Sequence, residues 1–272
     1  MSLQGKTLFI TGASRGIGRE IALKAAGQGA NIVIAAKSAE AHPKLPGTIF
    51  SVAAEVEAAG GQALALQLDV RDEEAVQAAM ARAAAHFGGI DALVNNAGAI
   101  RLKGVEHLEP KRYDLMFQIN SRAVMVCSQA ALPYLKKTQG HILSLSPPLN
   151  LDPKWFASYG PYTTTKYGMS MLTLGMHEEF RKYGISVNSL WPRTVIATAA
   201  IEFEAGGPTV MKAARLPAIM ADAACAILAS SGRSISGRLL IDEEILREQG
   251  QTDFEQYRFD PAGKLMTDLF VD

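Results

Sequence analysis

Residues 7–18 read TLFITGASRGIG, in which a strand-like run leads directly into a cluster of glycines. Thr7–Thr11 has the length and composition of a short buried strand, and Ile17–Gln28 has the apolar spacing of a helix. Glycines at such a junction tolerate positive φ and let bare backbone approach a ligand. The helix that follows offers unpaired N–H groups and a partial positive charge. The stretch therefore predicts a phosphate-binding turn between a strand and a helix.

The glycines of this turn are spaced Gly12-x-x-x-Gly16-x-Gly18. The spacing differs from the G-x-G-x-x-G fingerprint, and no Gly-Lys-Ser/Thr follows, which argues against a kinase or NTPase. The alternative interpretation is a turn that is tight for structural reasons only. We take the whole turn as candidate cofactor contacts: Gly12, Ala13, Ser14, Arg15, Gly16, Ile17 and Gly18.

Strand-like runs alternate with helical patterns along the rest of the chain. The runs are apolar on consecutive residues, which is typical of strands buried on both faces. Strands separated by helices imply crossovers and a parallel sheet. We expect an α/β fold with a single doubly wound parallel sheet of about seven strands, a Rossmann-like three-layer sandwich. The expected strands are Thr7–Thr11, Asn31–Ala36, Ala63–Leu68, Ile90–Asn95, His141–Ser146, Ile185–Trp191 and Arg238–Ile241, and the expected helices include Glu73–Phe87, Arg112–Lys137, Pro161–Tyr183 and Ala218–Ala229.

The composition bounds the class of protein. The chain has 272 residues, of which 48% are hydrophobic, and this suits one dinucleotide-binding domain spanning residues 1–272. Its 27 basic residues balance 27 acidic ones, so nothing favours nucleic acid or an anionic membrane as partner. Cys127 and Cys225 lie in apolar helical patterns typical of buried thiols, and no spacing predicts a metal site. With no signal peptide or bilayer-length apolar run, we expect a soluble cytoplasmic protein.

The end of the second expected strand indicates which dinucleotide would fit. An NAD site usually places a carboxylate there to bind the ribose hydroxyls. Here the strand ends Ala35-Ala36-Lys37-Ser38 without an acidic residue, and Arg15 lies in the phosphate turn. Two cations without a carboxylate favour a 2′-phosphate, so we expect NADP(H). The alternative for Lys37 is an ordinary solvated lysine.

Four motifs at the ends of expected elements resemble the short-chain dehydrogenase/reductase family over about residues 5–242. Thr11–Gly18 is similar to the cofactor-binding motif of that family, and Asp69-Val70 resembles the pair that meets the adenine. Asn95–Gly98 resembles the NNAG motif beside the adenosine, and Tyr162–Lys166 resembles the Tyr-x-x-x-Lys pair. The resemblance implies further cofactor contacts from Asp69, Val70, Asn96, Ala97, Gly98 and Lys166.

Shorter runs resemble one group within that family. Animal members of the group carry a sterol-carrier domain after the dehydrogenase, and we expect this chain to lack it. The runs are Ile34–Lys37, His42–Leu45, Ser146–Leu151, Asp222–Ala224 and Val271-Asp272.

Tyr162 and Lys166 carry the expected chemistry. Residues four apart share a helix face, and an ammonium beside a phenol should lower the pKa of the phenol. Tyr162 could then pass a proton to or from a carbinol oxygen while hydride moves at the nicotinamide. The resemblance implies that Lys166 also holds the nicotinamide ribose and that Asn120 keeps a water near the lysine. A lone Tyr-x-x-x-Lys would be a helix surface pair, but the accompanying motifs favour catalysis.

The serine that completes such a site departs from the family pattern. Aligned on the fifth strand, its usual position falls on Pro147, which has no hydroxyl, and Ser146 lies one residue earlier. A shift of one residue turns a side chain to the opposite face of a strand. Because Pro147 and Pro148 can bend the chain, we take Ser146 as the candidate that hydrogen-bonds the substrate oxygen.

A second departure follows the sixth strand. The family commonly has Pro-Gly there and a threonine nearby that touches the carboxamide, whereas this chain has Pro192-Arg193 followed by Thr194 and Thr198. Either Thr194 or Thr198 could make this contact, and we take Thr194 as the candidate. Residues 194–216 are the expected substrate lid, in which Ile196, Ile201, Phe203 and Met211 suit an apolar substrate or ordinary loop packing. Residues 248–272 carry spaced apolar side chains and should pack back on the protein or on a neighbour.

Two functions of different class remain open. The first is an NADP(H)-dependent oxidoreductase acting on a carbonyl or secondary alcohol, with an apolar or lipid-like substrate. The second is an NADP(H)-binding sensor or scaffold with little or no turnover, which Pro147 and Arg193 motivate. The resemblance also implies a homodimer or homotetramer paired through the helices around residues 112–137 and 161–183. Met125, Leu132, Met169, Leu172 and Met176 would serve that interface or the core.

Overall fold

The computed structural model describes residues 2–43, 45–204, 206–231 and 233–272. Within these residues, seven parallel strands form one sheet in the order β3-β2-β1-β4-β5-β6-β7. The strand order reverses between β1 and β4, which confirms the doubly wound sheet expected from the sequence. The strands are β1 Thr7–Thr11, β2 Asn31–Ala36, β3 Gln62–Gln67, β4 Ala92–Asn95, β5 His141–Ser144, β6 Ser186–Trp191 and β7 Leu239–Ile241.

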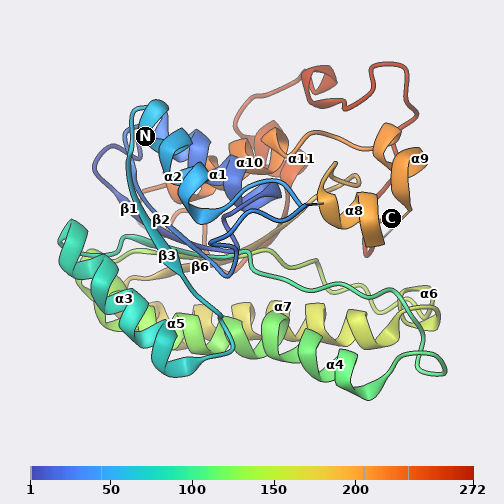
Figure 1. Ribbon diagram of the computed structural model, residues 1–272, viewed down its shortest axis with the longest axis horizontal. Coiled ribbons are helices and arrows are strands. Elements are labelled where there is room, and N and C mark those ends of the chain that lie inside the picture. Colours follow the sequence, from blue (N-terminus) through green and yellow to red (C-terminus); the bar gives the residue numbers. More distant parts are fainter. Residues whose placement is uncertain (1, 44, 205, 232) are drawn as a thin grey trace.

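Helices cover both faces of the sheet and complete the three layers (Figure 1). One layer contains α1 Gly16–Ala26, α2 Ile49–Ala58, α10 Ala218–Leu228 and α11 Asp242–Glu248. The other contains α3 Glu73–Phe87, α4 Pro110–Phe117, α5 Ala123–Thr138 and α7 Gly160–Phe180. Shorter helices lie in the connections: α6 Lys154–Ala157, α8 Ala199–Glu204 and α9 Gly207–Lys212.

The limits of α3 follow from its sequence. The Asp72 side chain caps the helix by accepting a hydrogen bond from the backbone N–H of Ala75 at 3.0 Å. Gly88 ends the helix in the left-handed conformation at φ +84°, where a side chain would be strained. The buried positions Val76, Ala79, Met80 and Ala83 repeat at helical spacing and face the sheet. Loss of the cap would cost about 1 kcal/mol.

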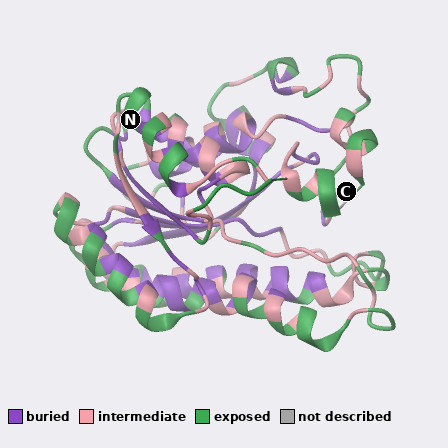
Figure 2. Cartoon of the chain, viewed as in Figure 1, coloured by how far each residue is buried: buried purple, intermediate pink, exposed green. Residues whose placement is uncertain are grey.

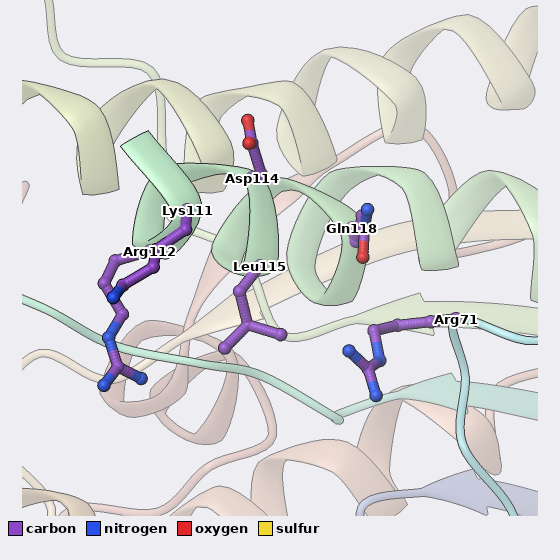
Figure 3. Close-up of a pocket in the computed structure, with 6 residues that line it drawn as sticks. All are labelled: Arg71, Lys111, Arg112, Asp114, Leu115 and Gln118. Atoms are coloured by element: carbon purple, nitrogen blue, oxygen red, sulfur yellow. The ribbon is translucent and has the colours of Figure 1, made fainter. Parts of the chain in front are cut away.

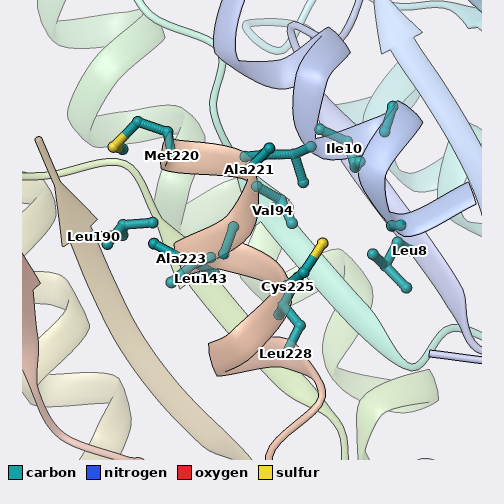
Figure 4. Close-up of a cluster of buried hydrophobic side chains, with 14 of the residues drawn as sticks. Leu8, Ile10, Val94, Leu143, Leu190, Met220, Ala221, Ala223, Cys225 and Leu228 are labelled. Carbon is teal, nitrogen blue, oxygen red and sulfur yellow. The ribbon is translucent and has the colours of Figure 1, made fainter. Parts of the chain in front are cut away.

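The strands are largely buried, except for the edge strand β3, in which only Leu66 is buried, whereas the outer faces of the helices are exposed (Figure 2). On one face of the sheet, Met220, Ala223 and Cys225 of α10 pack against apolar strand residues such as Leu143 and Leu190 (Figure 4). Each large side chain buried in this way contributes roughly 1.5–3 kcal/mol. Both cysteines are buried as expected, and burial raises the pKa of each thiol to about 12. The two thiols are therefore unreactive parts of the core.

Part of the expected secondary structure was wrong. The single helix expected over Arg112–Lys137 is divided, because α4 and α5 are joined by a π-helical turn, η1, at Gln118–Arg122. The fifth strand ends at Ser144 rather than Ser146, since Ser146 N bonds to the Ser144 carbonyl at 2.9 Å instead of continuing the ladder. The sequence patterns also missed α2 and α11. None of the helices in the described residues is long and apolar enough to cross a membrane.

Candidate active site

The phosphate turn lies between β1 and α1, at the carboxyl edge of the sheet. Gly12 has φ +67°, and a Cβ added there would lie 2.8 Å from Ala97 Cα. A Cβ on Gly18 would collide with the Asn96 amide. These two glycines are therefore required by the close approach of the 96–97 backbone as well as by the turn itself.

Asn96 and Ala97 hold this turn in place. The Asn96 side-chain amide donates to the carbonyls of Thr11 at 2.8 Å and Gly12 at 3.0 Å. The backbone N–H groups of Asn96 and Ala97 both donate to Thr11 Oγ1 at 3.0 Å. The two glycine-bearing motifs of the sequence thus meet, and Gly98 lies beside Asn120.

The amino end of α1 is open to a ligand. Arg15 occupies the N-cap position, and no side chain caps the helix there. The Arg15 guanidinium instead bonds to the carbonyls of Pro46 and Gly47 and to Ser38 Oγ, at 3.0 to 3.1 Å. It therefore lies across the end of β2, where the second expected cation, Lys37, also lies. Ala13 and Ser14 are buried beneath the turn, and Ile17 is half-buried on the helix.

Asp69 lies among cations at the ends of β2 and β3. Its carboxylate accepts hydrogen bonds from Arg71 at 2.6 to 3.1 Å and pairs with Lys37 at 3.2 Å. The Arg71 contact, followed by Lys37, holds the pKa of Asp69 well below its usual range. Val70 is buried next to it. Arg15, Lys37 and Arg71 thus gather at this edge with one carboxylate, which Arg71 already neutralises.

Tyr162 and Lys166 lie one turn apart on α7, and both are buried, at 6% and 7% exposed. Lys166 Nζ donates to the Leu145 carbonyl at 2.5 Å and lies 4.9 Å from the centroid of the Trp191 ring. Burial lowers the pKa of Lys166 to about 7. Burial also raises the pKa of Tyr162, with a smaller contribution from Asp268. The direction is opposite to the lowering expected from Lys166, because desolvation and Asp268 both disfavour the phenolate in this closed arrangement.

Asn120 braces the π-helical turn against α7. Its side-chain amide donates to the Ala99 carbonyl at 3.0 Å and to Thr165 Oγ1 at 2.9 Å, and its oxygen accepts from Ala99 N at 2.9 Å. The residue is completely buried. π-Helical turns are often found at functional sites. This one places Asn120 between the chain that follows β4 and the helix that carries Lys166.

The serine candidate, Ser146, lies two residues after the end of β5. Ser146 is completely buried, and within the described part of the chain its hydroxyl has no hydrogen-bond partner. Ser170 Oγ donates to the Pro147 carbonyl at 2.6 Å, which ties the chain after β5 to α7. Leu149, a little further on, packs in the same apolar cluster as Tyr162. The chain after β5 therefore passes close to the tyrosine, with Ser146 at its start.

The connection after β6 is held by acidic groups. Asp242 accepts a hydrogen bond from Arg193 N at 2.9 Å, and the Arg193 side chain pairs with Glu244. Burial raises the pKa of Asp242 to about 6. Thr194 is 6% exposed, and no described residue hydrogen-bonds its hydroxyl.

The expected lid folds into α8 and α9, with Ala205 between them outside the described residues. The apolar residues of the lid differ in burial. Ile196 is buried in the core cluster that includes α1 and α10, whereas Phe203 is 51% exposed. Arg101 pairs with Glu204 at 2.7 Å and so connects α8 to the chain after β4. Ile196 therefore serves packing and not a substrate surface.

Sequence reasoning missed the residues that cover Tyr162. Residues 248–272 pack back on the protein as expected, but the pattern gave no sign that Phe270 would stack on the Tyr162 ring. Asp268 also approaches the pair, and burial raises its pKa to about 7. No local periodicity could have revealed a contact between residues so far apart in the sequence.

Two surface hollows lie away from this pair. One, of about 460 Å³, lies over α4 and is lined by Arg71, Lys111, Arg112, Asp114, Leu115 and Gln118 (Figure 3). The other, of about 310 Å³, lies at the opposite edge of the sheet near Lys6, Asp91 and His141. Neither is lined by Tyr162 or Lys166, and these two residues are only 6% and 7% exposed, so they are closed off from solvent in this structure.

The residues present fit a nicotinamide dinucleotide. The uncapped amino end of α1 and the bare Gly12 backbone suit a pyrophosphate. The cations around Asp69 suit further phosphate or ribose oxygens. The unpartnered, buried hydroxyl of Thr194 suits a carboxamide. These groups all lie at the carboxyl edge of the sheet, where nucleotides bind in doubly wound folds.

Comparison with known proteins adds independent information. A model described as short chain dehydrogenase matches residues 6–205. Hydroxysteroid dehydrogenase-like protein 2 of Xenopus laevis is 55% identical over 99% of this chain. The chain spans 64% of the length of that relative.

Solved structures agree closely with the fold. A candidate dehydrogenase of Xanthomonas campestris has a TM-score of 0.96 and 53% identity, with both chains covered completely. A short chain dehydrogenase of Mycobacterium thermoresistibile has a TM-score of 0.93 and 49% identity, over 100% of this chain and 96% of that one. More distant structures hold either nucleotide: a metagenomic short-chain oxidoreductase with NADP is 28% identical over 89% of this chain and 98% of that one, at a TM-score of 0.73. A carveol dehydrogenase of Mycobacterium avium with NAD is 24% identical over 88% of this chain and 96% of that one, at a TM-score of 0.75.

Proposed function

The chain belongs to the short-chain dehydrogenase family of oxidoreductases, and from this we propose that it transfers hydride between NADP(H) and a carbonyl or secondary alcohol. Its similarity to hydroxysteroid dehydrogenase-like protein 2 also bears out the narrower resemblance noted in the sequence. The observation that carries the proposal is the position of Tyr162 and Lys166, one turn apart on α7 and at the same sheet edge as the phosphate turn. We treat residues 1–272 as one dinucleotide-binding unit.

Tyr162 is proposed to pass the proton, because its phenol lies on the helix face that carries Lys166. When bound, the nicotinamide supplies or accepts the hydride. Lys166, whose pKa is near 7 when buried, would gain or lose a proton close to neutral pH and would hold the nicotinamide ribose. Asn120 would position the helix through its bond to Thr165. Ser146 would hydrogen-bond the substrate oxygen, and Thr194 would contact the carboxamide.

NADP(H) is proposed over NAD(H) from the charges at the ends of β2 and β3. Arg15 and Lys37 both lie at the end of β2, and Arg71 lies beside them. Asp69 is paired with Arg71 through three hydrogen bonds, so it is poorly placed to bind ribose hydroxyls. A 2′-phosphate would meet guanidinium and ammonium groups there, which bind phosphate well.

The substrate is proposed to be apolar or lipid-like. Support comes from the cluster around Tyr162, which contains Met116, Trp191, Ile241 and Phe270. A hydroxyl or carbonyl next to Tyr162 would therefore belong to a molecule whose remaining surface is largely hydrocarbon.

The proposal also covers the oligomeric state and the cellular location of the protein. On the outer surface of α5 and α7, Met125, Met171 and Leu174 are 37 to 56% exposed. Because exposed apolar groups on neighbouring helices suit an interface, we propose a homodimer or homotetramer paired through them. Two unpaired cysteines agree with a reducing, cytoplasmic location.

The test is NADPH consumption with a panel of aldehydes and ketones that differ in apolar surface. We expect turnover with ring-bearing or long-chain carbonyls, and loss of turnover in the variant Tyr162→Phe. NADPH binding without turnover for any carbonyl in the panel would instead favour the alternative of a sensor or scaffold, which the departures at Pro147 and Arg193 support.

A further inference from the structure

Phe270 lies inside a cage of aromatic side chains. The cage consists of Trp155, Tyr159, Tyr162, Tyr167 and Trp191, whose ring centroids lie 5.2 to 6.5 Å from that of Phe270. Phe270 itself is 1% exposed. Since Tyr162 is one wall of this aromatic cage, the phenyl ring occupies space immediately beside the proposed proton-transferring residue.

The residues that carry Phe270 are held by separate single bonds, one of which joins Met266 N to the Ala213 carbonyl at 2.9 Å. Val195 N donates to the Met266 carbonyl at 3.0 Å, and Asp268 N donates to the Arg193 carbonyl at 3.0 Å. Trp191 Nε1 donates to the Leu269 carbonyl at 2.9 Å. Thr267 makes one isolated antiparallel bridge to Thr194, and no longer ladder includes these residues. We call residues 266–272 the gate segment.

An ion pair on the surface fastens the far side of the gate segment. Lys154 Nζ pairs with Asp272 at 2.6 Å, and the Asn150 side-chain amide donates to the same carboxylate at 2.8 Å. The Lys154 and Asp272 side chains are 51% and 68% exposed. Such a pair contributes little in water and is weakened by salt. The closed position therefore depends mainly on the Phe270 ring.

The backbone of Phe270 opposes this closed position. Its φ is +72°, in the left-handed region that residues with a side chain rarely adopt. Strained backbone persists where surrounding contacts hold it, and it is concentrated at ligand clamps and switch regions. Few backbone bonds, a strained residue and an exposed ion pair together describe a segment that opens more easily than the core.

We propose that residues 266–272 form a gate over the catalytic tyrosine, and that a ring of the substrate replaces the Phe270 side chain in the aromatic cage when the gate opens. This deepens the proposed function and rests on it for the role of Tyr162. The cage already holds a phenyl ring against Tyr162, so a substrate ring of similar size would find the same stacking surfaces. The substrate class is thus a carbonyl compound or alcohol that bears a ring next to the reacting carbon.

The chain provides its own probe of the gate. It has two tryptophans, Trp155 and Trp191, and both belong to the aromatic cage. Quenching of their fluorescence by acrylamide therefore reports whether the cage is covered, without cofactor or turnover. We compare the parent protein with Phe270→Ala and Asp272→Asn, and use Asp253→Asn as control, because Asp253 contacts neither Lys154 nor Asn150.

We expect the quenching constant to rise at least about twofold in Phe270→Ala, with a smaller rise in Asp272→Asn and none in Asp253→Asn. Raising the salt from about 0.05 M to about 0.5 M should increase quenching in the parent but not in Asp272→Asn, since screening weakens the ion pair. Benzyl alcohol, used as the ring probe, should protect the tryptophans in Phe270→Ala more than in the parent. Asp272→Asn keeps the test decisive if Phe270→Ala does not fold.

Equal quenching in the parent and both variants, at either salt concentration, would overturn the gate while leaving the oxidoreductase proposal intact. Quenching that rises without protection by benzyl alcohol would overturn replacement of Phe270 by a substrate ring. If quenching and protection behave as expected, the gate is supported even where NADPH consumption is absent, and that absence would count against the proposed function alone.

Discussion

The ring of Phe270 stacks on the ring of Tyr162, with centroids 6.4 Å apart and planes inclined by 28°. The tyrosine that matches the family's proton donor is thereby shielded from water. Burial raises its pKa instead of lowering it, and Lys166 beside it has a pKa of about 7. Proton transfer at neutral pH is therefore expected only after the surroundings of the tyrosine change.

Removing the Tyr162 hydroxyl should separate chemistry from binding. In Tyr162→Phe we expect the rate of NADPH consumption to fall at least about 100-fold, because general acid–base groups contribute about that much or more. NADPH affinity should change little, since the ring remains. Tyr113→Phe, on α4, is the matched control and should retain the parent rate. Comparable rates in Tyr162→Phe and the parent would remove Tyr162 from the mechanism.

Lys37 should contribute to the choice of nucleotide. Lys37→Ala is expected to weaken NADPH binding about tenfold and to leave NADH binding nearly unchanged, since only NADPH carries the 2′-phosphate. Lys111→Ala removes a similarly exposed lysine from α4 and should alter neither affinity. Titration by fluorescence transfer measures both. An equal loss of affinity for both nucleotides in Lys37→Ala would mean that the lysine does not bind the 2′-phosphate.

Asn120 should contribute to the stability of the fold as well as to the position of α7. Asn120→Ala removes the partner of Ala99 N and of the Ala99 carbonyl, and it removes one of the two hydrogen bonds of the buried Thr165 Oγ1. We expect the free energy of unfolding to fall by roughly 2–4 kcal/mol, measured by urea denaturation. Gln118→Ala, on the exposed side of the same turn, should change it little. A stability loss no larger than that of Gln118→Ala would contradict the bracing role.

Asp242 should make stability depend on pH. Burial raises its pKa to about 6, so its contribution to stability is full below the unfolded pKa of 3.8 and is lost as pH rises through 6. Asp242→Asn keeps an oxygen for Arg193 N but cannot ionise. The variant should therefore gain stability relative to the parent between about pH 4 and pH 7, by about 2 to 3 kcal/mol.

Urea denaturation of both proteins at the two pH values measures this difference. A stability difference between Asp242→Asn and the parent that stays constant with pH would show that the carboxyl does not titrate in that range.

The sheet and the phosphate turn could be predicted because their signals are local. Strands such as Asn31–Ala36 are apolar on consecutive residues, and only a sheet covered on both faces buries them. The glycines of residues 12–18 have a spacing that few other turns require. Their partner, Asn96, was identified by resemblance, and its bonds to Thr11 and Gly12 supply the physical reason.

The closed state of the site could not be predicted, because it depends on contacts between distant segments. Phe270 meets Tyr162 only after the chain that follows β6, at Thr194, has come together with Thr267. The π-helical turn at Gln118–Arg122 likewise depends on the bonds of Asn120 to Ala99 and Thr165. The roles of Ser146 and Thr194 stay predictions, since both hydroxyls are buried without a described partner.

The most direct test of the account is a parallel titration of the purified protein with NADPH and NADH, followed by fluorescence transfer from Trp155 and Trp191. The account predicts that both nucleotides bind and that NADPH binds at least about tenfold more tightly, because Arg15, Lys37 and Arg71 surround the expected 2′-phosphate. Tighter NADH would contradict the cofactor assignment, and binding of neither would contradict the proposed function.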